Sequence, residues 1–434
     1  MLERLTPTRI ARSIAYRTGR LLTGPHPQPV YIYDIKTRNS PDFLSMDLWA
    51  AKHKLLQVLA ALPYPKNYIV SKRWRSHLDT MLRAAKDLKS PTELAWLAQR
   101  VFDVEPTPIT PGIYGQFESD SRRYRQRFPE LSRATESSFL AANEVAVIDG
   151  LGYSAKLGQA FSYYADIHDG ISEMGSIKTI VEIGSGNGRM ARLMRIVDPS
   201  RKYVLVDLPE SLFFAYSFLR SNFPDARLHI SAPGEIITSL KDFDFVFCPV
   251  QLVENLQVND VDLVINTYSF AEMTQGCVDY LLSVVDRVIK PRFLYSLNMV
   301  FVDKANYHDT GGLDGDGNDT VLNHQPIWYP RRFVLVPAVN HEQFRITVSI
   351  VLERRDASRE QVLAQIAQAE KTTTDLQVIS GLRFFKAAWS EDADALDQFC
   401  DSLKVIYRSF GFPEPDLSAI GEVKFLKAKH ALDN

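Results

Sequence analysis

The sequence predicts an α/β protein built on a doubly wound, mostly parallel sheet, and three observations lead to this fold class. From residue 177 onward, short β-branched runs alternate with amphipathic helical stretches, which is the pattern of successive βαβ units. The first predicted strand runs directly into a glycine-rich loop that opens a helix. Near the end of this region, the apolar runs 333–336 and 344–352 are expected to pair as an antiparallel late strand and its partner.

Length and composition set the broad class. The 434 residues allow two to four domains, and 45% hydrophobic with 24% charged residues exclude a mostly disordered or fibrous chain. The net charge of −2 lacks the excess of positive charge that is typical of nucleic-acid-binding proteins. No apolar run reaches the ~18 residues of a transmembrane segment. The three cysteines lie far apart, so no disulfide scaffold or zinc site is expected, and a cytoplasmic location fits best.

Periodicity divides the chain into three parts. Residues 1–170 are expected to form a mainly helical N-terminal region, residues 171–357 the sheet domain, and residues 358–434 a helical C-terminal extension. The arginine-rich start is interpreted as a surface helix, with a membrane-surface helix or a targeting peptide as the alternatives. A second basic run lies at 122–127, where a solvated face is favoured over a patch that binds an anionic ligand.

The sheet domain is expected to alternate strands and helices. Apolar, β-branched runs predict strands at 179–181, 203–206, 243–247, 263–265 and 293–297. Apolar residues at three- and four-residue steps predict helices at 190–197, 212–219 and 278–288, and later at 360–370 and 393–410. The stretch from Met299 to Arg332 is irregular and glycine-containing, as in functional or disordered loops.

The strongest motif is the glycine loop V-E-I-G-S-G-N-G-R at 181–189. Its glycines allow a tight turn and the close approach of a ligand to the main chain. A dinucleotide fingerprint requires Gly-x-Gly-x-x-Gly, but here the third glycine comes one residue early. A carboxylate at Glu182, two residues before the first glycine, suits a cationic ligand group and would repel a pyrophosphate. These two features disfavour a nicotinamide dehydrogenase.

An acidic residue ends the second predicted strand. Asp207 lies nineteen residues after Gly188, where a carboxylate can accept hydrogen bonds from both ribose hydroxyls. The alternative is an aspartate that caps the helix beginning near Pro209. Together with the glycine loop, the position favours ribose binding.

The spacing Glu-x-Gly-x-Gly-x-Gly resembles motif I of the class I S-adenosylmethionine-dependent methyltransferases, whose sheet is Rossmann-like. The resemblance implies S-adenosylmethionine as cofactor, with Gly184 and Gly186 packed beneath it and Glu182 contributing to its amino-acid end. The complete set of implied cofactor-binding residues is Glu182, Gly184, Ser185, Gly186, Gly188, Asp207 and Leu208.

Two further segments resemble a bacterial family of predicted sugar O-methyltransferases. They are D-L-P-E at 207–210 and D-L-V-I-N-T-Y-S-F-A-E-M at 262–273. The resemblance covers residues 179–298 together with Arg354 and Arg355. It implies O-methylation of a sugar hydroxyl by in-line displacement, with a sugar or nucleotide sugar as the acceptor.

Other functions stay open beside this one. A natural-product methyltransferase, an amino-sugar methyltransferase and a non-catalytic scaffold of the same fold are the alternatives. The intact set Glu182, Gly184, Gly186 and Asp207 gives no sign of a degenerate scaffold. By analogy at the level of the fold, the N-terminal region is expected to cover the acceptor side and to supply homodimer contacts.

A sugar hydroxyl is a poor nucleophile at neutral pH, so a base is expected near the strand ends. Glu272 follows the fourth predicted strand and is one candidate base, although it also fits a charge at a helix N-terminus. His324, which two aromatic residues follow closely, is the other candidate base. Ser269 and Asn298 are candidate substrate ligands, and Asn298, taken to end the fifth strand, also fits an ordinary turn.

The irregular loop is rich in acidic residues. Asp314, Asp316 and Asn318 begin like an EF-hand, but Asp319 and Gln325 replace the glycine and glutamate that such a loop requires. The alternatives are a looser Mg²⁺ site and a solvated acidic loop. The solvated loop is favoured because aspartate and glycine commonly cluster in turns, so no metal ligand is assigned.

Overall fold

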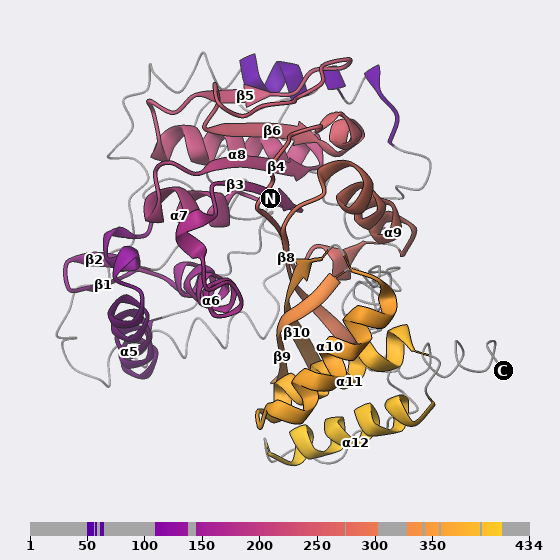
Figure 1. Ribbon diagram of the computed structural model, residues 1–434. Helices are drawn as coiled ribbons and strands as arrows, with labels where there is room; N and C mark the ends of the chain where they lie inside the picture. The colour runs from indigo at the N-terminus through magenta and orange to yellow at the C-terminus, as the bar shows by residue number, and fades with distance from the viewer. Residues whose placement is uncertain are drawn as a thin grey trace, which may run out of the picture.

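The computed structural model describes residues 50–64, 109–137, 145–302, 328–340 and 343–409, apart from positions 56, 59, 60, 274, 356, 391 and 392. An eight-stranded sheet forms the centre of the molecule (Figure 1). In spatial order its strands are β5 (Leu228–Ile230), β6 (Phe245–Pro249), β4 (Lys202–Asp207), β3 (Thr179–Ile183), β7 (Leu263–Thr267), β8 (Phe293–Val302), β10 (Gln343–Arg354) and β9 (Trp328–Asn340).

The strand directions confirm the predicted fold class. The six strands from β5 to β8 are parallel, whereas β10 runs antiparallel to both β8 and β9. The chain runs from β3 to β4 and on to the edge strand β5, turns back to insert β6 between β5 and β4, and then crosses to the other side of β3 to form β7 and β8. This reversal creates a switch point between β3 and β7, where the carboxyl ends of an α/β sheet leave a crevice for a ligand.

Helices cover the sheet as expected for βαβ units. Helix α6 (Ala155–Gly170) packs on β9 and β10, α7 (Arg189–Val197) on β4, and α8 (Pro209–Asn222) on β4 and β6. Helix α9 (Gln275–Val284) continues into one π-helical turn, η6 (Val285–Ile289), which Lys290 caps directly before Pro291. Because proline cannot donate to a preceding turn, the helix ends where the sequence predicts.

The C-terminal part of the chain forms three helices beside β9 (Figure 1): α10 (Arg359–Thr372), α11 (Leu376–Trp389) and α12 (Ala393–Ser409). Aromatic rings attach them to the sheet, with the centroids of Phe333 and Phe384 6.0 Å apart. Gly381 of α11 allows the close approach, since a Cβ there would lie 2.3 Å from Phe333. The sequence pattern missed α11 and the short strand β5.

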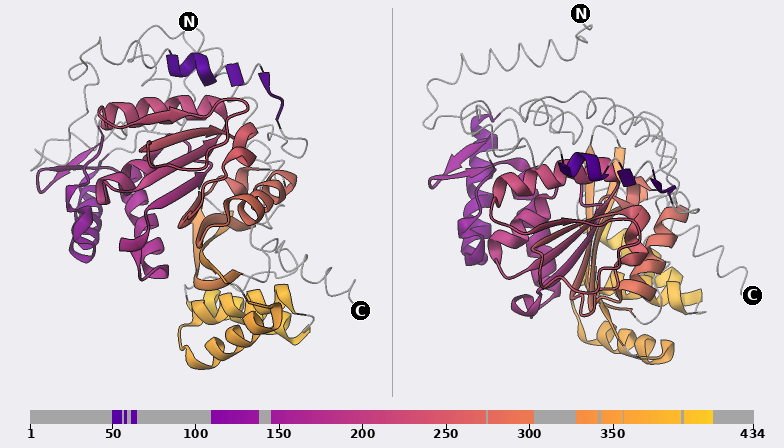
Figure 2. Two further views of the ribbon diagram at one scale, coloured as in Figure 1. Left: turned by 45° about the horizontal axis from the view of Figure 1, so that its top comes forward. Right: turned by 90° about the horizontal axis from the view of Figure 1, so that it is seen from above.

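The described parts of the N-terminal region are helical with one exception. Helix α5 (Pro111–Arg127) is capped by Thr110, but β1 (Ala146–Ile148) and β2 (Leu151–Tyr153) form a small antiparallel hairpin that the sequence did not predict. The segment 50–64, indigo in Figures 1 and 2, lies over the β5 edge beside α8 and adds buried apolar side chains to the core.

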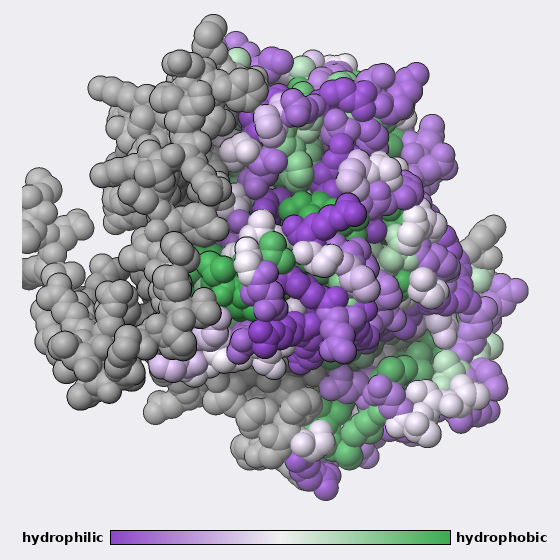
Figure 3. All heavy atoms as spheres, turned by 90° about the vertical axis from the view of Figure 1, so that its left-hand side faces the viewer, coloured by the Kyte–Doolittle hydropathy of each residue, from purple (hydrophilic) through white to green (hydrophobic). Residues whose placement is uncertain are grey.

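The basic run of α5 lies on a mainly hydrophilic face (Figure 3). Arg122 pairs with Asp149 at 3.0 Å, Arg123 with Asp120 at 2.9 Å, and Arg127 with Asp169. Arg125 donates to the main-chain oxygen of Ala134 at 2.8 Å. All four guanidinium groups therefore have protein partners, which favours the solvated-face interpretation over an anion patch. In the part of the chain that is described, no helix combines the length and apolarity needed to cross a membrane.

Two expected boundaries are wrong. The irregular stretch does not begin at Met299 or extend to Arg332, because β8 continues to Val302 and β9 already begins at Trp328. Asn298 therefore lies inside a strand rather than at its end. Long antiparallel pairing with β10 extends both strands beyond their apolar runs.

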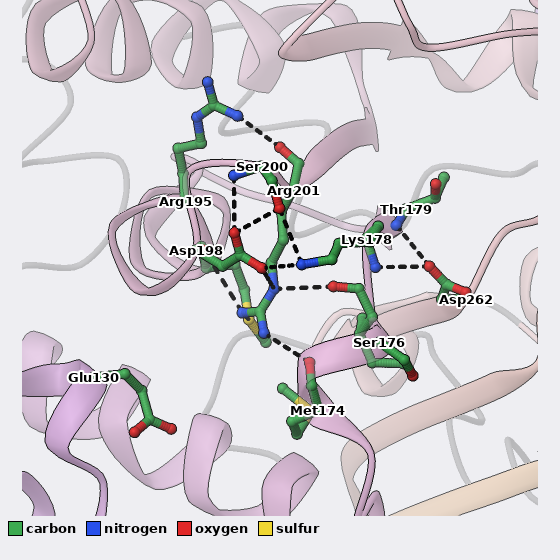
Figure 4. A network of polar contacts seen from close by, with 12 residues as sticks. Glu130, Met174, Ser176, Lys178, Thr179, Arg195, Asp198, Ser200, Arg201 and Asp262 are labelled. Atoms are coloured by element: carbon green, nitrogen blue, oxygen red, sulfur yellow. Dashed lines mark hydrogen bonds and ion pairs between the residues drawn. The ribbon is translucent and has the colours of Figure 1, made fainter.

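A polar network closes the amino end of the sheet (Figure 4). The Lys178 ammonium contacts Asp198 at 2.6 Å, while Asp262 accepts hydrogen bonds from the main-chain N–H groups of Lys178 and Thr179 at 2.7 and 2.9 Å. Arg201 is almost fully buried and donates to two main-chain oxygens at 3.1 and 3.2 Å. These groups satisfy one another, so the polar chemistry available to a ligand lies at the opposite, carboxyl end.

Candidate cofactor site

The glycine loop follows β3 and lies at the switch point of the sheet. Gly184, Gly186 and Gly188 adopt left-handed φ values of 72°, 53° and 78°, a region that other residues rarely occupy. The loop closes with a hydrogen bond from the Gly188 N–H to the Ser185 oxygen at 2.9 Å, and α7 begins at the next residue. The sequence therefore places a tight turn and a helix N-terminus next to each other, as nucleotide-binding loops require.

Ser269, which follows β7, packs directly on the first glycine. A Cβ at Gly184 would lie 1.9 Å from the Ser269 Oγ. This hydroxyl donates to the Ile183 main-chain oxygen at 3.3 Å and accepts from the Asn266 amide at 2.6 Å. The Asn298 amide in turn donates to the Asn266 Oδ1 at 2.9 Å and is buried. Ser269 and Asn298, predicted as substrate ligands, thus belong to a hydrogen-bond network that connects the glycine loop to β7 and β8.

Asp207 ends β4 and fastens the glycine loop. Its carboxylate accepts hydrogen bonds from the main-chain N–H of Gly186 at 2.7 Å and of Leu208 at 2.6 Å. Burial raises the pKa of Asp207 to about 6, opposed by these two hydrogen bonds and reinforced by the charge of Glu272. Each carboxylate oxygen keeps acceptor capacity, so the group can still take hydroxyl hydrogens from a ligand.

Glu182 is buried within β3, with 2% of its surface exposed. Its Oε2 accepts a hydrogen bond from the Tyr203 hydroxyl at 2.9 Å. Burial raises the pKa of Glu182 to about 8; the Tyr203 hydrogen bond opposes this shift and the charge of Asp207 adds to it. A nearby cationic ligand group would stabilise the ionised form.

The raised pKa of Glu182 predicts a pH-dependent stability of the free protein. The unfolded chain loses this proton near the ordinary value of 4.5, whereas the folded protein keeps it up to about 8. The free energy of unfolding should therefore fall by a few kcal/mol as pH rises from about 5 to 8, at about 1.4 kcal/mol for each pKa unit. Urea denaturation across this range should show a flatter dependence for Glu182→Gln. Identical slopes for the two proteins would contradict the assignment.

Some of the remaining predicted site residues lie near Asp207, and others lie outside the described residues. Leu208 is buried and caps the start of α8, while Glu272 ends a short 3-10 turn, η5 (Phe270–Glu272), close enough to act electrostatically on Asp207. His324 and the acidic residues 314–319 lie outside the described residues. Within the described ranges, no group of three or more metal-ligating side chains could hold a metal ion.

Two tyrosines meet beside the loop: Tyr268, which the sequence places either near the cofactor or in the core, and Tyr163, which the sequence did not single out. Tyr268, between β7 and Ser269, has a left-handed φ of 60°, a strained conformation for an aromatic residue. Its ring centroid lies 6.3 Å from that of Tyr163 on α6. One helical turn along, Asp166 accepts from the Ser349 hydroxyl at 2.9 Å and from Arg332 at 3.0 Å. Sequence periodicity contains no signal for this meeting, because α6 and β7 are about a hundred residues apart.

Three side chains that follow parallel strands have buried polar atoms without a hydrogen-bond partner among the described residues. The Ser185 Oγ, the Glu210 Oε2 and both polar atoms of the Gln251 side chain are buried, and none has a hydrogen-bond partner in the described part of the chain. These residues lie in the glycine loop, after β4 and after β6 respectively. Buried polar groups without partners are rare in folded proteins, so these atoms are candidates for contact with a ligand.

Comparisons with known proteins find matches to solved structures, at low sequence identity. No protein-family model and no curated protein matches the chain. Solved structures do match: the N-methyltransferase NodS from Bradyrhizobium japonicum is 9% identical, with 46% of this chain and 97% of that chain covered and a TM-score of 0.32. The precorrin-6y C5,15-methyltransferase from Geobacter metallireducens is 13% identical, with 44% and 88% covered and a TM-score of 0.27. The methyltransferase domain of bacterial CtHen1 is 12% identical, with 45% and 99% covered and a TM-score of 0.31.

Proposed function

We propose that the protein is an S-adenosylmethionine-dependent methyltransferase that methylates a hydroxyl group of a sugar or nucleotide sugar. One observation carries the proposal: the glycine loop after β3 is fastened by the carboxylate that ends β4, through the 2.7 Å hydrogen bond from the Gly186 N–H to Asp207. The hydrogen bond holds the glycine loop, whose main chain a ligand can approach closely, beside a carboxylate that can accept hydrogen bonds from ribose hydroxyls.

The charge of the site favours this cofactor over a dinucleotide. Glu182, Asp207 and Glu210 are buried acids at one end of the sheet, and burial raises the pKa of each. A pyrophosphate would add two negative charges to this cluster, whereas a sulfonium and an ammonium group would relieve its repulsion. In the proposal, Asp207 holds the ribose and Glu182 attracts the cationic end.

S-adenosylmethionine, when bound, supplies a methyl group on a positively charged sulfur. Transfer of this methyl group forms the O–C bond to the acceptor while the C–S bond breaks, and the proton of the acceptor hydroxyl passes to a base. Glu272 is the proposed base, because it lies at the carboxyl end of β7 within electrostatic reach of Asp207. His324 is the second candidate. The sugar class is supported by the resemblance of segments 207–210 and 262–273, and by the tyrosine rings and carboxylate of Tyr163, Tyr268 and Asp166, which suit a polyol.

Thermal unfolding with S-adenosylhomocysteine, and with NAD as control, tests the cofactor. At ~100 times its dissociation constant, a specific ligand stabilises the fold by about 2.7 kcal/mol. Stabilisation by S-adenosylhomocysteine alone is expected, and stabilisation by NAD alone would overturn the proposal. Transfer of a labelled methyl group to free sugars and nucleotide sugars, with and without Mg²⁺, then tests the acceptor class.

A further inference from the structure

Glu210 is a buried acid that the expected chemistry of the site does not use. It is the second residue of α8, directly after Pro209, and only 7% of its surface is exposed. Its Oε2 has no hydrogen-bond partner, and no lysine, arginine or histidine in the described ranges forms an ion pair with it. The carboxylate accepts a hydrogen bond from the main-chain N–H of Glu210 itself, but Oε2 is left without a partner in the described part of the chain. Burial of a carboxylate oxygen without a partner is costly, so a group outside the described chain is the natural explanation.

The neighbours of Glu210 are the groups that surround the proposed ribose site. Asp207 lies three residues earlier, and Tyr64 of the segment 50–64 lies within electrostatic reach of both acids. Burial raises the pKa of Glu210 to about 7; the hydrogen bond from its own main-chain N–H opposes this shift, and the charge of Asp207 adds a smaller contribution to it. Glu272 from the β7 side acts on Asp207 as well, so acidic groups face this place from β4, α8 and η5, and a phenol faces it from the N-terminal segment.

The Asp207 carboxylate already accepts hydrogen bonds from within the protein. Both of its oxygens accept a main-chain N–H, from Gly186 and Leu208, at 2.7 and 2.6 Å. A ribose presents two adjacent hydroxyl donors, and a second carboxylate beside the first supplies a further acceptor, the unengaged Oε2 of Glu210. A hydrogen bond to a charged acceptor contributes more than one to a neutral acceptor.

We propose that Glu210 is a second ligand-binding carboxylate of this site, which accepts a hydrogen bond from a ribose hydroxyl of the bound nucleoside alongside Asp207. The proposal takes the cofactor class from the proposed function, but it requires only that the ligand carry a ribose. A bound hydroxyl donates the hydrogen bond that the Glu210 Oε2 otherwise lacks among the described residues. In the free protein the carboxylate keeps a desolvation penalty that ligand binding relieves.

Glu210→Gln tests the proposal, with Glu360→Gln as the matched control. Glu360 is likewise the second residue of its helix, but it is exposed at the start of α10. Calorimetry would measure the dissociation constants of S-adenosylhomocysteine, its 2′-deoxy and 3′-deoxy analogues, S-adenosylmethionine and NAD. Thermal unfolding at pH 8 without ligand would be measured in parallel.

The expected result is a loss of affinity for S-adenosylhomocysteine of about 10-fold in Glu210→Gln and none in Glu360→Gln. For one of the two deoxy analogues, Glu210→Gln and the wild type should bind equally. The ligand-free midpoint of Glu210→Gln should be unchanged or higher, because the variant removes a buried charge.

Several outcomes would overturn the proposal. Unchanged affinity with a lower midpoint would mean that Glu210 is structural, and an equal loss for the parent compound and both deoxy analogues would exclude a ribose contact. A loss for S-adenosylmethionine well above that for S-adenosylhomocysteine would assign Glu210 to the cationic group instead. If only NAD binds, and Glu210→Gln weakens it, the proposed function fails while the ribose contact stands; if no nucleoside binds, both fail.

Discussion

Replacing Asp207 by asparagine is expected to weaken the binding of S-adenosylhomocysteine by about 100-fold, or about 2.8 kcal/mol. The variant has nearly the same shape but loses the negative charge that attracts ribose hydroxyls. Its amide can accept through only one atom, so it cannot hold the Gly186 and Leu208 N–H groups together as the carboxylate does at 2.7 and 2.6 Å. Hydrogen bonds from two ribose hydroxyls to the charged carboxylate would contribute about 1.5–3 kcal/mol each, which makes this the largest expected effect on binding.

The control for this prediction is Asp225→Asn, the same chemical change at an exposed position just after α8. Isothermal titration should give unaltered affinity for the control, and both variants should keep the wild-type unfolding midpoint to within a few degrees. In Asp207→Asn, the loss of one main-chain hydrogen bond destabilises the free fold, but the removal of a carboxylate whose pKa is raised to about 6 offsets part of that loss. Wild-type affinity in Asp207→Asn would mean that the carboxylate does not contact the ligand.

Gly184→Ala is expected to reduce the free energy of unfolding by about 3 kcal/mol and to abolish cofactor binding. Two effects contribute. A φ of 72° costs a residue with a Cβ roughly 1–2 kcal/mol, and the new methyl group would lie 1.9 Å from the Ser269 Oγ. Forcing a contact of this kind in a packed region costs about 1–3 kcal/mol more. Urea denaturation measures the sum.

Two further variants separate these effects. Gly150 has a similar φ of 79°, and a Cβ added there would meet nothing within 4 Å, so Gly150→Ala measures the backbone strain alone. Ser269→Gly removes the atoms that the Gly184 methyl group would strike, so the double variant Gly184→Ala/Ser269→Gly should recover the steric part. If the two substitutions change the free energy of unfolding by strictly additive amounts, the methyl group at position 184 does not clash with Ser269 in solution.

The fold class was accessible from the sequence because its signals are local. Short apolar runs mark β3, β4, β6 and β7, and the helices after β3, β4 and β7 have apolar residues at helical spacing, so the alternation itself indicates a doubly wound sheet. The glycine loop is equally local: glycine is the residue that most readily adopts a left-handed backbone, and all three glycines at these alternate positions adopt it. Element ends were less accurate, since pairing with β10 extends β8 and β9 past their apolar runs.

The sequence by itself thus determined the sheet, the glycine loop, and the position of Asp207 at the end of the neighbouring strand. Only the tertiary structure decided which side chains reach that edge: Ser269 against Gly184, Tyr163 against Tyr268, and Glu210 buried without a partner for its Oε2 among the described residues. The physical reason is that periodicity reports which face of an element is apolar, whereas contacts between residues far apart in the chain depend on how whole elements pack. Burial converts an ordinary acid in the first turn of a helix into a candidate ligand, and no local pattern encodes burial.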